Sequence, residues 1–97
     1  MTEELHHGQM QRVLIVEDEV DIADLIKFNL QRAGYEVSQA HDGIAGAEMA
    51  IRERPDLMIL DLMLPGRDGY SVIREIRRDA RTSRIPVIML TARAQTE

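Results

Sequence analysis

The stretch Met58-Ile59-Leu60-Asp61-Leu62-Met63-Leu64-Pro65-Gly66-Arg67-Asp68-Gly69 decides the fold that this sequence predicts. Residues 57–60 are apolar at every position, which is the pattern of a parallel strand buried on both faces. Asp61 follows directly, so its carboxylate is expected at the C-terminal end of that strand, where open α/β sheets bind ligands. A proline and two glycines then indicate a loop before the next helix. A lone aspartate at such a point most often only caps a turn, so a functional role for Asp61 requires other acids nearby.

Apolar runs and helical spacing alternate along the rest of the chain. Apolar runs predict further strands at residues 13–16, 35–40 and 85–91. Amphipathic spacing predicts helices from about residues 22–33, 44–54 and 70–80. Strands that alternate with helices at this spacing form βαβ units, whose right-handed crossovers place helices on both faces of a parallel sheet. The predicted fold class is therefore α/β, a doubly wound parallel sheet.

The first predicted helix has a clear apolar face. The residues expected to face inward are Ile22, Leu25, Ile26, Leu30 and Ala33. Gly34 follows them as the expected C-terminal stop of the helix. The strand at residues 35–40 is more polar than the others, which indicates a position at the edge of the sheet.

The composition limits the class of protein. The chain has 97 residues, of which 44% are hydrophobic and 30% charged, as in one small globular domain without a membrane span. It contains no cysteine, so neither disulfides nor a thiolate metal site is possible, and a cytoplasmic location is expected. Residues 1–11 are polar and lack the apolar core of a signal peptide, so we expect a flexible tail followed by one domain at residues 12–97.

The charge of the chain bears on its partners. The net charge is -5, which argues against direct nucleic-acid binding by this domain. Arginines nevertheless gather in and after the third predicted helix, where two acids are interspersed with them. These arginines are Arg74, Arg77, Arg78, Arg81 and Arg84. They are interpreted as a solvated face, and the alternative is a basic strip that meets an acidic partner.

Two predicted strands end in acids. If the strands at residues 13–16 and 57–60 are neighbours, Glu17, Asp18 and Asp61 project from the same edge of the sheet into one pocket. Three carboxylates so close repel one another, so they either take up protons, with raised pKa values, or recruit a cation. Because all the ligands are oxygens, a hard ion such as Mg²⁺ is favoured.

A metal at this position would allow Asp61 to act as a nucleophile. Once its charge is offset, the carboxylate can attack a phosphoryl group and form an acyl phosphate. Thr91 ends the last predicted strand at the same edge, where its hydroxyl is placed to donate a hydrogen bond to phosphoryl oxygens. The alternative for a threonine that ends a strand is a purely structural role.

Three motifs resemble those of a known family. They are LIVEDE at residues 14–19, LDLMLPG at residues 60–66 with Asp68-Gly69 after it, and PVIMLTA at residues 86–92. Together they resemble the receiver domain of two-component response regulators, over about residues 11–93. The resemblance implies a flavodoxin-like fold. The run at residues 87–93 is most similar to receivers attached to winged-helix transcription factors.

The resemblance implies a role for each residue that matches the motifs. It makes Asp61 the phosphoacceptor and a ligand of Mg²⁺, together with the acidic pair Glu17 and Asp18. It makes Met63 a further metal ligand through its backbone carbonyl, and Thr91 the switch hydroxyl that follows the phosphoryl group. The phosphoryl group would come from a sensor histidine kinase, and the output would be a DNA-binding domain that regulates transcription. The domain would be a signalling phosphoacceptor and not an enzyme.

The chain departs from this family at its C-terminal end. Receivers carry a further helix, a fifth strand with a phosphate-contacting lysine, a switch aromatic and a last helix, and the sequence ends before them. Lys27, the only lysine, lies in the first predicted helix and cannot replace the missing one. The predicted domain is thus truncated after the fourth strand, and we expect impaired phosphorylation. Because this strand is too apolar for a bare sheet edge, we expect that the chain either is a fragment of a longer regulator or forms a homo-oligomer through this strand.

Two other functions share features with this sequence. A phosphatase of the haloacid-dehalogenase type also uses an aspartate nucleophile with Mg²⁺, but it needs a second acid two residues later, where this chain has Met63. The other alternative is a truncated or degenerate receiver that no longer carries phosphate and acts as a protein-interaction module.

Overall fold

The computed structural model describes residues 10–65 and 67–90. Strands and helices alternate along this part of the chain, as predicted, with small shifts at their ends. The elements are β1 (Arg12–Val16), α1 (Val20–Arg32), β2 (Glu36–Ala40), α2 (Gly43–Glu53), β3 (Leu57–Asp61), α3 (Gly69–Arg78) and β4 (Val87–Leu90).

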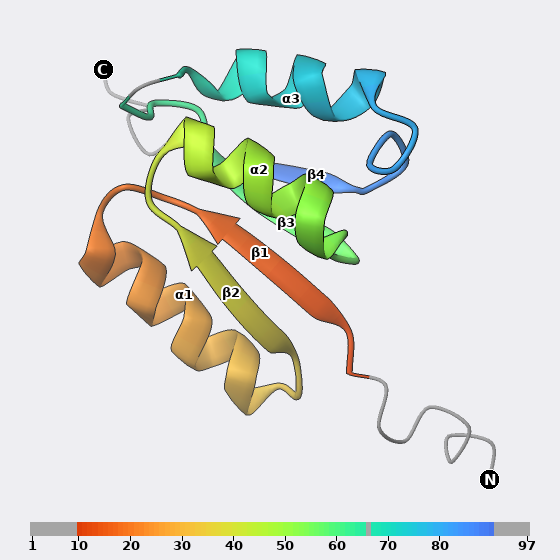
Figure 1. Cartoon of the computed structure of the whole chain (residues 1–97). Coiled ribbons are helices and arrows are strands. Elements are labelled where there is room, and N and C mark those ends of the chain that lie inside the picture. Colours follow the sequence, from red (N-terminus) through yellow and green to blue (C-terminus); the bar gives the residue numbers. More distant parts are fainter. Residues whose placement is uncertain (1–9, 66, 91–97) are drawn as a thin grey trace, which may run out of the picture.

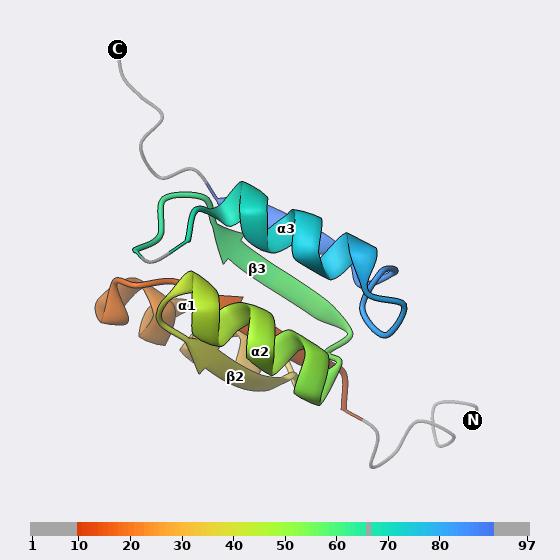
Figure 2. The ribbon, with the colours of Figure 1, turned by 45° about the horizontal axis from the view of Figure 1, so that its top comes forward.

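The strands form one parallel sheet in the order β2-β1-β3-β4. Figure 1 shows α1 on one face of this sheet and α2 and α3 on the other, and the turned view in Figure 2 agrees. The predicted α/β class and the doubly wound parallel sheet are therefore confirmed. The most polar strand, β2, lies at an edge, also as predicted.

Each face of the sheet carries its own apolar core, because side chains alternate along β1 and β3. The core beneath α2 and α3 is the larger, and its buried residues include Leu14, Val16, Ala47, Ala50, Met58, Leu60, Val72 and Ile76. The core beneath α1 has four buried residues, Val13, Ile15, Ala23 and Ile59. Burying one large aliphatic side chain contributes roughly 1.5–3 kcal/mol, so most of the stability comes from the α2 and α3 side.

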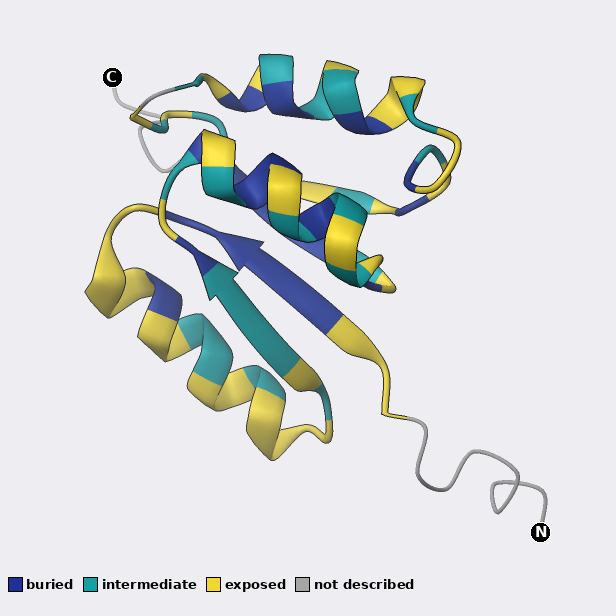
Figure 3. Cartoon of the chain, in the orientation of Figure 1, coloured by how far each residue is buried: buried dark blue, intermediate teal, exposed yellow. Residues whose placement is uncertain are grey.

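The apolar face of α1 is only partly covered. Ala23 is buried, and Ile26 and Leu30 pack on the sheet. Ile22 and Leu25 are 37% and 62% exposed and Ala33 is exposed too, so the prediction that these three face inward is wrong. The reason is that α1 packs on β1 and β2 and covers only half of the sheet face. Much of α1 is consequently exposed in Figure 3, whereas β1 is buried along most of its length.

Aspartate caps begin the two helices that follow β2 and β3. Asp42 accepts a hydrogen bond from the Ala45 N–H (2.8 Å), and Asp68 accepts one from the Ser71 N–H (2.8 Å). Such caps contribute about 1 kcal/mol each and fix where the helix begins. They place the N-terminal ends of α2 and α3 beside the C-terminal edge of the sheet.

The outer edge of the sheet at β4 is apolar, as the sequence indicated. β4 pairs with β3 on one side, and within the described residues no strand covers its other side. Ile88 and Met89 are 50% and 49% exposed on the two faces of this strand. An apolar strand of this kind with free backbone donors and acceptors is a template for pairing with another chain.

We expect the 97-residue chain to self-associate at micromolar concentration through β4. Ile88→Lys should shift the chain toward monomer, because a charge on an edge strand opposes pairing. Ile44→Lys is the matched control, since Ile44 is equally exposed (52%) but lies in α2. Sedimentation velocity across a concentration series measures this, and a parent chain that stays monomeric throughout would contradict the expectation.

Candidate functional site

The acids of the predicted pocket come together at the C-terminal edge of the sheet. Val16 of β1 is paired with Leu60 of β3, so the residues that follow, Glu17 and Asp61, end neighbouring strands at the same level. One carboxylate oxygen each from Glu17, Asp18 and Asp61 lies within 4.8 Å of the others. Glu17 and Asp61 are buried, and Asp18 is exposed. The structure thus brings together the three acids that the sequence placed at one edge of the sheet.

Backbone hydrogen bonds hold Glu17 in place. Its N–H donates to the carbonyl of Ala40 (3.0 Å), which extends the β1–β2 pairing to the end of the strand. Its carboxylate accepts a hydrogen bond from the N–H of Glu19 (3.0 Å), where the chain turns into α1. The side chain is therefore directed into the pocket by the turn between β1 and α1.

The loop after β3 holds Asp61. The N–H of Met63 donates to Asp61 Oδ1 (2.9 Å), which orients the carboxylate. The N–H of Leu62 donates to the carbonyl of Leu90 (3.2 Å), so the pairing with β4 continues past the end of β3. These contacts fix both the acid and the loop that leaves it.

Gly69 allows the start of α3 to lie against this loop. Its N–H donates to the carbonyl of Leu62 (3.1 Å). A Cβ atom at Gly69 would lie 2.7 Å from Leu62 Cα and 2.9 Å from the carbonyl oxygen of Asp61, and these backbone atoms cannot move aside. In the sequence, Gly69 indicates only a loop, so this close approach could not be predicted from it.

Two of the predicted site residues are placed only in part. The side chain of Met63 is exposed, and its backbone N–H donates a hydrogen bond to Asp61. The metal-binding role of the Met63 backbone carbonyl stays a prediction. Thr91 lies outside the described residues. Leu90, which precedes it, is paired with Asp61 in the β3–β4 register.

The environment of Glu17 changes its acidity. Burial raises the pKa of Glu17 to about 7. The hydrogen bond from the Glu19 N–H opposes this change, and the negative charge of Asp61 adds to it. The pocket therefore disfavours three ionised carboxylates, as the sequence analysis expected for acids so close together.

Without Mg²⁺, the chain is expected to be more stable near pH 5 than near pH 8. The pKa of Glu17 is raised from an ordinary value of 4.5 to about 7 by folding, so between these values the folded state binds a proton that the unfolded state does not. This stabilisation is fully present below the lower value and is lost as the pH rises through about 7.

Thermal melts in EDTA at a series of pH values test this prediction. Glu17→Gln removes the titrating group, so the variant should lose most of the pH dependence and melt several degrees above the parent near pH 8. If the variant shows the same slope as the parent, a different group causes the dependence.

The donor set suits a divalent cation. The pocket offers only oxygen ligands from Glu17, Asp18 and Asp61, and Mg²⁺ typically takes one or two carboxylates with its remaining ligands from water or phosphate. Burial is the main cause of the raised pKa of Glu17, and a cation would offset the repulsion from Asp61 that adds to it. The fold and the site together define an α/β domain with a cluster of three acids at the C-terminal edge of a parallel sheet, whose oxygens could hold a metal ion.

The comparisons with known proteins identify the family. Residues 13–97 match the family model described as the response regulator receiver domain, and the chain belongs to this family. It is a signalling phosphoacceptor family and not a class of catalytic enzymes, and its members pair with sensor histidine kinases. No helix in the described part of the chain is long and apolar enough to cross a membrane.

Relatives of known structure or function share this domain. The chain is 52% identical over 88 residues to the DNA-binding dual master transcriptional regulator RpaA of Synechocystis; the match covers 91% of the chain and 36% of that regulator, about a third of its length. The receiver domain of the sensor histidine kinase PA1611 from Pseudomonas aeruginosa PAO1, with magnesium in its active site cleft, is 40% identical (TM-score 0.84; 90% of this chain, 71% of that one). The phosphorylated cyanobacterial phytochrome response regulator RcpA is 33% identical (TM-score 0.78; 89% and 68%).

Proposed function

We propose that this receiver domain takes a phosphoryl group from a sensor histidine kinase onto Asp61, in a Mg²⁺-dependent manner. The observation that carries the proposal is the convergence of Glu17, Asp18 and Asp61 within 4.8 Å at the end of two paired strands. The phosphorylated and magnesium-bound states of two relatives support it.

The chemistry is a single displacement at phosphorus. A carboxylate oxygen of Asp61 forms a bond to phosphorus, while the bond from phosphorus to the histidine nitrogen of the kinase breaks and its electron pair passes to that nitrogen. The N–H of Met63 orients the Asp61 carboxylate for this attack. The product is an acyl phosphate.

The other residues of the site have supporting roles in this proposal. Glu17, Asp18 and Asp61, with the backbone carbonyl of Met63, would hold Mg²⁺, which when bound supplies positive charge that offsets the carboxylates and the phosphoryl oxygens. After Asp61 is phosphorylated, the hydroxyl of Thr91 would move to donate a hydrogen bond to the phosphoryl group.

The output of the switch is proposed from the relative. The similarity to a DNA-binding transcriptional regulator supports transcription regulation through a separate DNA-binding domain, and a winged-helix domain agrees with the motif at residues 87–93. This receiver itself would not touch the nucleic acid, since its net charge is -5. We propose that residues 12–97 form the receiver domain of a regulator. We also propose that the protein is located in the cytoplasm.

Incubation with acetyl phosphate tests the proposed function. In Mg²⁺, part of the intact chain should gain the mass of one phosphoryl group, in agreement with the expected impaired phosphorylation. Hydroxylamine should remove this group, because an acyl phosphate is a reactive acyl donor. In EDTA the mass should not change. No gain in Mg²⁺ would overturn the proposal and favour the alternative, a degenerate receiver that acts by protein contact alone.

A further inference from the structure

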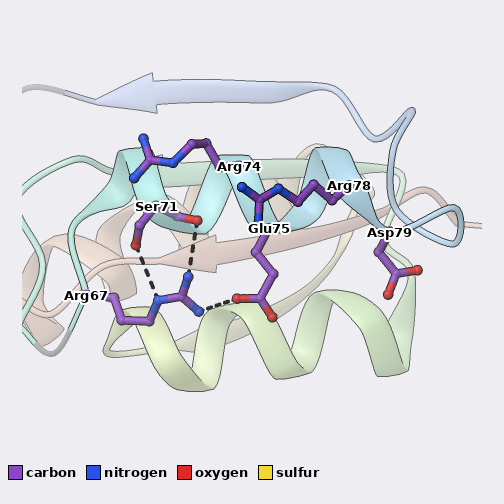
Figure 4. Close-up of a pocket in the computed structure, with 6 residues that line it drawn as sticks. All are labelled: Arg67, Ser71, Arg74, Glu75, Arg78 and Asp79. Carbon is purple, nitrogen blue, oxygen red and sulfur yellow. Dashed lines mark hydrogen bonds and ion pairs between the residues drawn. The ribbon is translucent and has the colours of Figure 1, made fainter.

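The arginines of this acidic chain are concentrated in one segment. Residues 67–84 contain six arginines and three acids, a net charge of +3 in a chain whose total is -5. Three of these arginines, Arg67, Arg74 and Arg78, line an open hollow of about 490 Å³ along α3, with Ser71, Glu75 and Asp79. Figure 4 shows this arginine hollow.

The acids of the arginine hollow already have partners. Glu75 forms an ion pair with Arg67, whose guanidinium also donates to the hydroxyl and the carbonyl oxygen of Ser71 (3.3 and 3.2 Å). Asp79 forms an ion pair with Arg81 (2.7 Å), which lowers the pKa of Asp79 to about 2. Neither carboxylate is therefore free to neutralise another arginine.

Arg74 and Arg78 are the uncompensated charges of the arginine hollow. Both are exposed, and neither guanidinium forms an ion pair or hydrogen bond with any residue in the described part of the chain. They lie four residues apart on α3, a spacing at which like charges destabilise a helix by roughly 0.2–0.5 kcal/mol. By contrast, Arg77 has a structural role, since it donates to the carbonyls of Ser83 and Ile85 (3.1 and 2.6 Å).

We propose that the arginine hollow on α3 is a docking surface for an acidic protein segment, with Arg74 and Arg78 as its two anchoring charges. Residues four apart in a helix are displaced by about 6 Å along its axis. Acidic side chains four apart in a partner helix, or two apart in an extended segment, have nearly the same separation. Each guanidinium can then pair with one carboxylate, with two N–H groups available for each pair.

The lining of the arginine hollow favours a protein segment over nucleic acid or free phosphate. The backbone of DNA carries a charge about every 1.7 Å, so it would also meet the carboxylates of Glu75 and Asp79 and the negative remainder of the chain. A single phosphate would need donors that converge, whereas Arg74 and Arg78 are one turn apart and Arg67 is already engaged. Because the lining contains both arginines and acids, it is better matched by a protein segment whose carboxylates are several residues apart.

Fluorescence anisotropy with a defined peptide tests the docking surface. The probe is a fluorescein-labelled, alanine-rich helical peptide with glutamates four residues apart, at low ionic strength, and the control peptide has glutamines instead. We expect the parent chain to bind only the glutamate peptide. The double variant Arg74→Gln/Arg78→Gln should bind roughly twofold to thirtyfold more weakly, as expected for the loss of two exposed ion pairs.

Arg52→Gln is the matched control, since Arg52 is an exposed arginine of α2 (side chain 65% exposed) outside the arginine hollow, and it should bind as the parent does. Circular dichroism and acetyl phosphate labelling should be unchanged in the double variant, because both arginines lie outside the acidic pocket. Equal peptide binding by the parent and the double variant would overturn the proposal. So would displacement of the peptide by inorganic phosphate at lower concentration, or tighter binding of duplex DNA.

Discussion

Asp61→Asn is expected to abolish phosphoryl uptake from acetyl phosphate. The amide has no ionised oxygen with which to attack phosphorus, so no acyl phosphate can form at this position. Its Oδ1 can still accept the hydrogen bond that the Met63 N–H makes with Asp61 (2.9 Å), so the loop after β3 should keep its shape. Mass spectrometry after incubation in Mg²⁺ measures the result directly.

The matched control for this variant is Asp68→Asn. Asp68 is an exposed acid in the same loop, where it caps α3 through the Ser71 N–H, and asparagine caps a helix as well as aspartate does. The control should therefore be labelled as the parent is. Equal labelling of the Asp61 variant and the parent would show that another residue is the nucleophile.

The same Asp61 variant should fold as well as the parent or slightly better in EDTA. Asp61 is buried beside Glu17, and neutralising one member of a repelling cluster removes part of that repulsion. Thermal melts of the two proteins compare their stabilities. A loss of labelling that came with unfolding would make the first result uninformative, so both are measured on one preparation.

Millimolar Mg²⁺ is expected to stabilise the intact chain. A ligand that binds only the folded state at tenfold excess over its dissociation constant contributes about 1.4 kcal/mol. For a domain of this size that corresponds to a rise in the melting midpoint on the order of 5–10 °C. An unchanged midpoint in Mg²⁺ would rule out the proposed metal site.

Substitutions in the acidic cluster locate the metal. Glu17→Gln and Asp18→Asn should each remove most of the Mg²⁺-dependent rise, since each takes away one carboxylate of the cluster. Asp21→Asn is the matched control, because Asp21 is an exposed acid in the first turn of α1 outside the cluster. If Asp21→Asn also lost the Mg²⁺-dependent rise in the melting midpoint, the rise would come from the overall negative charge and not from binding at the acidic cluster.

Much of the fold could be predicted from local patterns. Residues 57–60 are apolar throughout, and a run of that kind can be satisfied only where both faces of the strand are buried, which is how β3 lies between β1 and β4. The positions of the helices followed from apolar spacing and from stop signals such as Gly34, whose φ of 101° suits glycine. The apolar edge at β4 was likewise evident from its residues.

The sequence by itself determined which acids end the strands, because Glu17 and Asp61 directly follow apolar runs and parallel strands present their carboxyl ends at one edge. Only the tertiary structure decided how these acids are held: the turn that directs Glu17 inward, the Met63 N–H on Asp61, and the close approach of Gly69. It also decided that Leu25 is exposed. The reason is that spacing along the chain defines a helix face, whereas burial depends on what the sheet offers to cover it.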